Sequence, residues 1–137
     1  MKRLIVILGI AVLFSTGYAQ TPIYEGVDGS YYADLNTPYN GLYEEYFENG
    51  NTKIEMNFTN GKVDGQVKLF YANGALNEVR SYDKGKMNGK WVTYAKDGIK
   101  LAEASYVKGK KNGKWYVWDE NGVLRYEIEY KKGKRSG

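Results

Sequence analysis

From residue 41 onward, short runs of alternating apolar and polar residues are separated by turns that contain glycine. In the last such segment, residues 113–118 read Gly-Lys-Trp-Tyr-Val-Trp, and residues 123–130 alternate apolar and charged side chains. Asn121 and Gly122 lie between these runs, and an Asn-Gly or Asp-Gly pair between two β-rich runs is a strong signal for a β-hairpin. The pattern therefore predicts a two-stranded hairpin here, with a type I′ turn at the Asn-Gly pair.

The glycines show that this hairpin is repeated, because all thirteen glycines after residue 40 recur at a spacing of 24 residues. Glycines of the first turn are Gly50, Gly74, Gly98 and Gly122, and those of the second turn are Gly61, Gly85, Gly109 and Gly133. Such phasing predicts four repeats within residues 41–137, at 41–64, 65–88, 89–112 and 113–136. Two strands per repeat predict an all-β fold, an elongated antiparallel meander of about eight strands. Residues 20–40 lack most of this lattice and are predicted to form an N-terminal cap.

Strand alternation assigns side chains to the two faces of the predicted sheet. A two-residue loop at Asn121-Gly122 gives a more apolar face that holds Trp115, Val117, Leu124, Tyr126 and Ile128. The opposite face then holds Tyr116, Trp118, Val123, Arg125 and Glu127. Two charged residues of the second repeat, Glu78 and Arg80, fall on the more apolar face and fit this pattern less well.

Aromatic residues follow the same 24-residue spacing in three columns. The first is Tyr46, Phe70, Tyr94 and Trp118, the second is Phe58, Tyr82, Tyr106 and Tyr130, and the third is Tyr43, Val67, Trp91 and Trp115. For the second and third columns, we favour cross-strand packing that stabilises the sheet. The first column lies on the more polar face, where exposed aromatic area must be covered or bind something. Its four residues are therefore the first candidates for a partner-binding surface.

The N-terminus predicts export. Lys2 and Arg3 precede an apolar stretch at 4–14, and Gly17-Tyr18-Ala19 resembles a signal-peptide cleavage site, so residues 1–19 are expected to be removed. The apolar stretch of about 11 residues is short for a membrane span, and no other segment could form one. The chain has no cysteine, which argues against a lipoprotein and against disulfides. We expect a periplasmic or secreted protein without a transmembrane segment in its mature chain.

Charge is distributed unevenly. Residues 20–80 hold four basic and nine acidic side chains, whereas residues 81–137 hold fourteen basic and seven acidic ones. The basic residues of the second turns are candidates for contact with acidic partners and include Lys108, Lys110, Lys111, Lys131, Lys132, Lys134 and Arg135. The simpler interpretation is that these lysines solvate exposed turns. Without Lys2 and Arg3 the net charge falls from +4 to +2, which by itself is too small to indicate binding to nucleic acid or to a membrane.

The residues needed for most catalytic and metal sites are absent. Without histidine or cysteine, the chain cannot form a Ser-His-Asp triad, a cysteine nucleophile or a zinc site with nitrogen or sulfur ligands. Glu103 and Glu127 could in principle act as a pair of acid and base, but they occupy one repeat column, where a solvated ladder is the simpler interpretation. The sequence predicts no enzyme, no cofactor and no metal.

The repeat resembles the bacterial variant of the MORN repeat. This similarity rests on Gly89-Lys90-Trp91, Tyr94, Asp97-Gly98, Tyr106 and Gly109-Lys110, with the matching positions of the other copies. The resemblance implies hairpins laid side by side in a twisted sheet that act as a scaffold for proteins or membrane phospholipids. Some bacterial members are labelled antitoxin-like, and others accompany surface adhesins. Residues 113–123 also look like the aromatic cell-wall-binding repeats that recognise choline or glucans, although their unit is nearer 20 residues.

Taken together, these features favour an exported, non-enzymatic repeat scaffold that binds another protein through the column of Tyr46, Phe70, Tyr94 and Trp118. One alternative is a glycan or cell-wall binding module that uses the same aromatic side chains. Another is association with acidic phospholipid headgroups through the lysine-rich turns.

Overall fold

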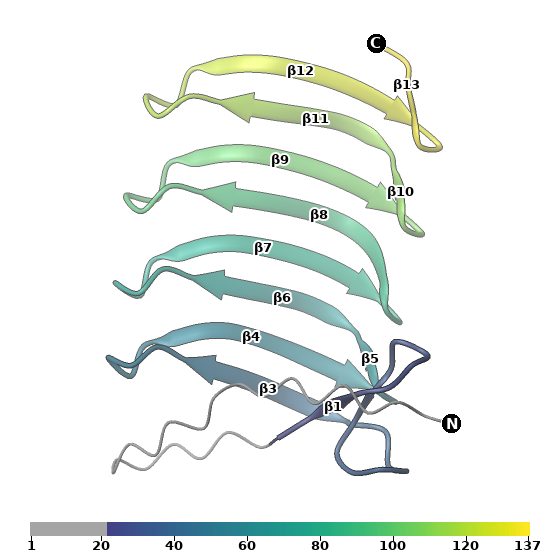
Figure 1. Cartoon of the computed structure of the whole chain (residues 1–137). Helices are drawn as coiled ribbons and strands as arrows, with labels where there is room; N and C mark the ends of the chain where they lie inside the picture. The colour runs from purple at the N-terminus through teal and green to yellow at the C-terminus, as the bar shows by residue number, and fades with distance from the viewer. Residues whose placement is uncertain (1–21) are drawn as a thin grey trace.

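The computed structural model describes residues 22–137, so the expected signal segment and its cleavage position lie outside the described part of the chain. The described part is all-β. Eleven strands form one long antiparallel meander, and two short strands pair separately near the N-terminus (Figure 1). In order, the strands are β1 (Tyr24–Glu25), β2 (Tyr31–Tyr32), β3 (Gly41–Tyr46), β4 (Thr52–Thr59), β5 (Lys62–Val63), β6 (Gly65–Phe70), β7 (Leu76–Asp83), β8 (Lys86–Tyr94), β9 (Lys100–Val107), β10 (Lys110–Lys111), β11 (Gly113–Trp118), β12 (Leu124–Lys131) and β13 (Lys134–Arg135).

Four hairpins stack along the sheet, and they are formed by β3–β4, β6–β7, β8–β9 and β11–β12. The predicted meander is confirmed. The count rises from eight strands to eleven because the chain continues to pair after each second turn. The short strands β5, β10 and β13 pair back onto β4, β9 and β12, while in the second repeat this return segment runs on without a break as the start of β8.

The turn types differ from the prediction. At the Asn-Gly and Asp-Gly turns only the glycine has positive φ, for example 76° at Gly122, so these turns are not type I′. Asp119 and Val123 close the last of them, through Asp119 N–H to Val123 O and Gly122 N–H to Asp119 O, which is a type I turn followed by a left-handed glycine. The side chain of the Asn or Asp at turn position i+2 explains this in the first three repeats, where its oxygen accepts the N–H two residues on, as at Asn49 and Asn51.

Type I′ geometry occurs instead at the second turns. Asn60, Lys84, Lys108 and Lys132 all have φ between 46° and 50°, and the glycine after each also has positive φ. These four are the only non-glycine residues with positive φ within 22–137. The backbone strain of the fold is therefore concentrated at the second turns, which we call the lysine turns (residues 59–62, 83–86, 107–110 and 131–134).

The longer first turn also adds one residue to the following strand and thereby shifts the register. Val117 pairs with Tyr126 as predicted, but Trp118 pairs with Leu124, which leaves Arg125 as a bulge. Leu124 therefore pairs with Trp118 and lies on the same face as Trp118, not on the face of Trp115. The predicted face of Leu124 is wrong. Each of the four hairpins has this shift at the same place.

Hydrogen bonds across the lysine turns join neighbouring repeats. The N–H groups of Gly61, Gly85, Gly109 and Gly133 donate to the carbonyl oxygens of Tyr39, Val63, Met87 and Lys111, at 2.7–2.8 Å. Asn40 Oδ1 accepts from Asn60 N–H at 2.7 Å, as Asn88 Oδ1 accepts from Lys108 N–H at 3.1 Å. Tyr39 and Asn40 thus accept the same hydrogen bonds that the last two residues of a repeat accept from the next lysine turn.

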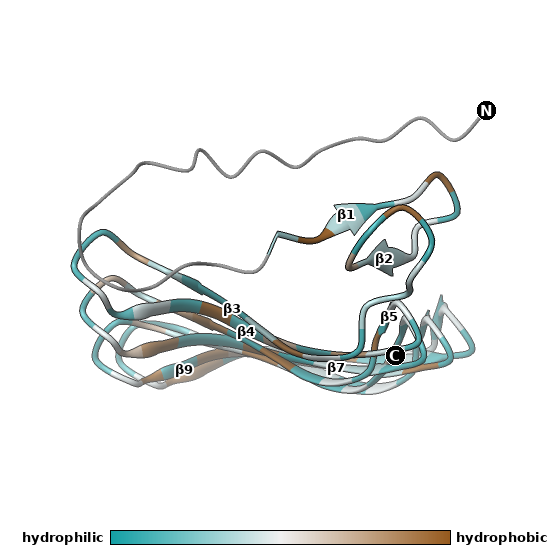
Figure 2. Cartoon of the chain, turned by 90° about the horizontal axis from the view of Figure 1, so that it is seen from below, coloured by the Kyte–Doolittle hydropathy of each residue, from teal (hydrophilic) through white to brown (hydrophobic). Residues whose placement is uncertain are grey.

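The sheet is a single layer with little core. Phe58 (3% exposed), Val67 (5%) and Val92 (9%) are the buried hydrophobic residues among those described. Strands β1 and β2 lie over one face of the sheet (Figure 2), at the end formed by β3 and β4 (Figure 1). We call this the cap face and the opposite one the back face. The ends of the hairpins bend toward the cap side, as β5 does in Figure 2.

Candidate functional site

The cap face carries a continuous row of aromatic rings in the last two repeats. Trp91, Tyr106, Trp115 and Tyr130 follow one another with ring centroids 5.8, 5.3 and 4.8 Å apart, distances at which aromatic pairs attract. The indole N–H of Trp115 donates to Ser105 O at 3.0 Å, which fixes the orientation of that ring. We call these four residues the aromatic row. No other part of the described chain covers them as a second layer.

Cationic side chains lie over the aromatic row. The guanidinium of Arg80 lies 4.5 Å from the ring centroid of Trp91, and Lys111 Nζ lies 4.7 Å from that of Trp115. Arg80 also pairs with Glu78, a contact that raises the pKa of Arg80. The two charged residues that fitted the predicted apolar face poorly are thus held there by this ion pair and by the indole. The row is consequently both aromatic and positively charged.

In the first repeat the same surface is occupied by the chain itself. The ring of Tyr31 lies 5.0 Å from that of Phe58, and Tyr39 meets Phe58 edge-on at 5.5 Å. The N–H of Tyr31 donates to Gly61 O at 2.7 Å. Burial, with Glu45 nearby, raises the pKa of Tyr43 to about 12. Residues 30–39 thus bury the aromatic side chain of Phe58 on the cap face, whereas the matching aromatic side chains of the later repeats are partly exposed.

The back face holds the column predicted for partner binding, because Tyr46, Phe70, Tyr94 and Trp118 alternate with the residues of the cap face. The structure does not assemble them into one contact surface of stacked rings. Tyr46 donates its hydroxyl to Glu44, and Trp118 stacks on Tyr116 at 5.5 Å with Lys100 over its ring. Their role in binding stays a prediction.

Two carboxylates of the back face, those of Glu103 and Glu127, are paired with lysines. Glu103 accepts from Lys90 at 2.6 Å and from Lys100 at 2.9 Å, and Glu127 pairs with Lys114. These contacts hold the pKa of Glu103 below its ordinary value, whereas a general acid requires a raised pKa. The lowered pKa thus opposes a general-acid role for Glu103. Within residues 22–137 no group of three or more potential metal ligands occurs, and no helix is long and apolar enough to span a membrane.

The Glu103 contacts predict a pH-dependent contribution to stability. Because the folded pKa of Glu103 is lowered, its contribution is fully present above the ordinary value of 4.5 and is lost as the pH falls below it. Glu103→Gln should slightly lower the urea midpoint of unfolding at pH 7, and the difference from the unsubstituted chain should shrink below pH 4.5. Glu120→Gln is the control, because Glu120 is exposed and the described residues provide no ion pair for it. It should leave the urea midpoint unchanged both at pH 7 and below pH 4.5. A Glu103→Gln effect of equal size at pH 7 and pH 3 would contradict the assignment.

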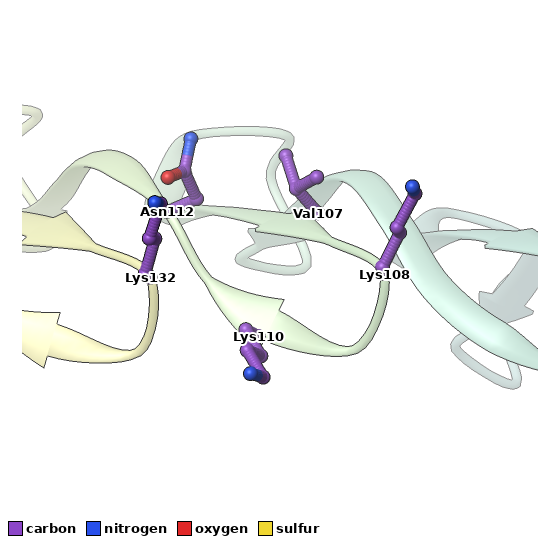
Figure 3. Close-up of a pocket in the computed structure, with 5 residues that line it drawn as sticks. All are labelled: Val107, Lys108, Lys110, Asn112 and Lys132. Carbon is purple, nitrogen blue, oxygen red and sulfur yellow. The ribbon is translucent and has the colours of Figure 1, made fainter.

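The lysine turns line one long edge of the sheet (Figure 1). Between the last two turns, Val107, Lys108, Lys110, Asn112 and Lys132 surround a shallow cavity of about 210 Å³. Figure 3 shows Lys108 and Lys132 pointing to one side of the turn segment and Lys110 pointing to the other. The three ammonium groups therefore do not converge on one point. Lys111 Nζ lies over the rings of Trp115 and Tyr130. Lys111 is exposed, as are Lys131, Lys134 and Arg135.

Sequence reasoning interpreted the aromatic row as packing and so missed it as a candidate surface. A column of one aromatic residue per repeat looks the same whether a second layer covers it or not. The signal that could have identified the row was the lack of a segment to form that layer, since residues 20–40 are the only segment of the expected mature chain outside the four repeats.

A comparison with protein families identifies the repeat. The model of the MORN repeat variant matches residues 39–60, 63–84 and 111–132. The hairpin β8–β9 lies between the second and third matches and continues the same sheet. No curated protein is significantly similar to the chain.

Proposed function

The chain belongs to the MORN repeat variant family, and from this premise we propose that it is an exported scaffold that binds another protein at the cell envelope or outside the cell. MORN repeat domains are generally protein-binding scaffolds and typically non-catalytic. Export is supported by the sequence of residues 1–19, which has the charged start, apolar stretch and small-residue end of a signal peptide.

We propose that the partner binds the cap face over the aromatic row. The observation that carries this proposal is that residues 30–39 already use this face in the first repeat, where they bury Phe58 to 3% exposure. The corresponding column residues, Tyr106 and Tyr130, are only partly buried. Partly exposed aromatic side chains beside cations are typical of protein interfaces. The apolar surface continues onto β11 and β12, where Val117 is 40% and Tyr126 64% exposed.

A capture experiment with one double variant per face tests the proposal. Tagged chain is used to recover partners from envelope and extracellular fractions, and Trp91→Ala/Trp115→Ala is compared with Tyr94→Ala/Trp118→Ala. Loss of the cap-face indoles should reduce partner recovery by about tenfold or more, since aromatic residues dominate binding energy, while the back-face variant should retain most of it. Circular dichroism checks that both variants keep the β-fold. Recovery that is lost only in the back-face variant would instead support the first predicted column.

A further inference from the structure

The chain's own residues 30–31 show how a partner segment could dock on a repeat. Three contacts define the docking: Tyr31 N–H donates to Gly61 O, the Tyr31 ring lies on Phe58, and Ser30 covers Gly61. A Cβ added to Gly61 would lie 2.7 Å from Tyr31 O and 3.4 Å from the Ser30 Cβ. Glycine at position 61 is therefore needed for the backbone to approach the turn this closely. Ser30, before the tyrosine, is only 7% exposed, so a larger side chain has little room there.

The later repeats present the same groups without an occupant. Gly85, Gly109 and Gly133 have φ of 84°, 79° and 86°, close to the 76° of Gly61. Within residues 22–137 the structure gives their carbonyl oxygens no hydrogen bond, although the carbonyl of Gly61 has one. A Cβ added to Gly109 would meet nothing within 4 Å. Gly109 thus lies open where Gly61 is covered.

The Gly109 turn has the most complete set of these groups. Its column residue is Tyr106, where the first repeat has Phe58, and Tyr106 lies between the rings of Trp91 and Trp115. A tyrosine placed as Tyr31 is placed on Phe58 would therefore meet three rings of the aromatic row. We call Gly109, Tyr106 and the two indoles the open docking site.

Charge indicates which kind of segment this site accepts. Residues 22–40, which supply the docked segment, contain Glu25, Asp28 and Asp34 and no basic residue. The turn beside Gly61 carries one lysine, Lys62, whereas the turn beside Gly109 carries three, at 108, 110 and 111. An acidic segment is therefore attracted more strongly to the Gly109 turn than to the turn where the chain's own segment lies.

We propose that the open docking site binds an extended, acidic segment of a partner protein in which a small residue precedes a tyrosine. The segment donates a backbone N–H to Gly109 O, places its tyrosine ring on Tyr106 between Trp91 and Trp115, and directs its acidic side chains toward the lysine turn. This inference rests on the proposed binding of a protein partner, and it specifies the chemistry of the part that is bound.

A peptide with the sequence of residues 24–40 is the probe, and the three tryptophans of the chain are the reporters. The indole N–H signals of Trp91, Trp115 and Trp118 are followed by NMR while the peptide is added to the complete, nitrogen-labelled chain. Saturable shifts are expected for Trp91 and Trp115, and none is expected for Trp118 on the back face. If the peptide instead replaced the chain's own docked segment at Phe58, the Trp115 signal would stay unchanged, and this result would contradict the proposal.

Two matched controls define the contacts. The peptide with Tyr31→Ala should bind about tenfold or more weakly, because it lacks the ring, and salt at about 0.5 M should weaken the binding of the unsubstituted peptide. In the chain, Tyr106→Ala should reduce binding similarly, whereas Tyr94→Ala on the back face should not. The absence of saturable shifts at about millimolar peptide, equal shifts of all three indoles, or equal binding of the Tyr31→Ala peptide would each overturn the proposal. Because capture of natural partners needs no peptide, the proposed function can hold even where this inference fails.

Discussion

Replacing Phe58 with alanine is expected to destabilise the chain by about 3–5 kcal/mol, as large-to-small changes of buried aromatic residues do. Phe58 is the most buried hydrophobic residue among those described, and the rings of Tyr31, Tyr39 and Tyr43 all lie within 6.5 Å of its own. The N-terminal segment should then lose its hold on β4.

Urea unfolding followed by circular dichroism measures the change in free energy, and limited proteolysis reports release of residues 22–40. Tyr126→Ala is the matched control, because this ring on β12 is 64% exposed and its loss should change the free energy by less than about 0.5 kcal/mol. If Phe58→Ala and Tyr126→Ala were equally stable, the docked segment would contribute nothing to the fold.

The repeat, the hairpins and the meander could be predicted because each depends on local spacing. Glycine in both turns of each repeat marks the chain reversals. Alternation along a strand assigns a side chain to a face of the sheet, as it did for Trp115 and Ile128. Such features need no knowledge of neighbouring repeats. The order of the strands then follows, because consecutive antiparallel strands joined by tight turns lie side by side.

The turn types could not be predicted from the dipeptides. Asn-Gly and Asp-Gly favour type I′, but here the side-chain oxygens of Asn49, Asn73 and Asp97 accept the N–H two residues on, which stabilises the type I turn. Lysine has no particular preference for positive φ, yet Lys84 and Lys108 adopt it, since an Asp or Asn of the preceding repeat accepts the N–H of each. This hydrogen bond joins residues 20 positions apart, and a local pattern does not contain it.

The candidate surface was harder to predict than the fold for a similar reason. Whether Tyr106 is a packing residue or a contact residue depends on what covers it. The N-terminal segment covers Phe58 but does not extend to the later repeats (Figure 1). Composition gave only an indirect indication of this, through the acidic character of residues 22–40 and the basic character of the later turns. The charge difference between the two halves is thus the sequence feature most closely related to the proposed docking.

A pair of glycine variants distinguishes the contribution of the docked segment to stability from that of the turn it contacts. Gly61→Ala and Gly109→Ala introduce the same side chain at the same turn position, where φ is 76° and 79°. Both should lose about 1–2 kcal/mol because a non-glycine residue is strained in the left-handed region. Only at Gly61 would the new Cβ also lie 2.7 Å from a backbone atom, Tyr31 O, so the segment must move and its hydrogen bond to Gly61 O must lengthen.

Gly61→Ala is therefore expected to be less stable than Gly109→Ala by at least about 1 kcal/mol, the usual contribution of one hydrogen bond. It should also expose residues 22–40 to proteolysis, whereas Gly109→Ala should leave that segment protected. Urea midpoints and the rate of cleavage measure the two effects separately. Equal stability of the two variants would contradict the close approach of Tyr31 to Gly61. Because nothing lies over Gly109, the small change expected there is itself a measure of how open the corresponding place in the third repeat is.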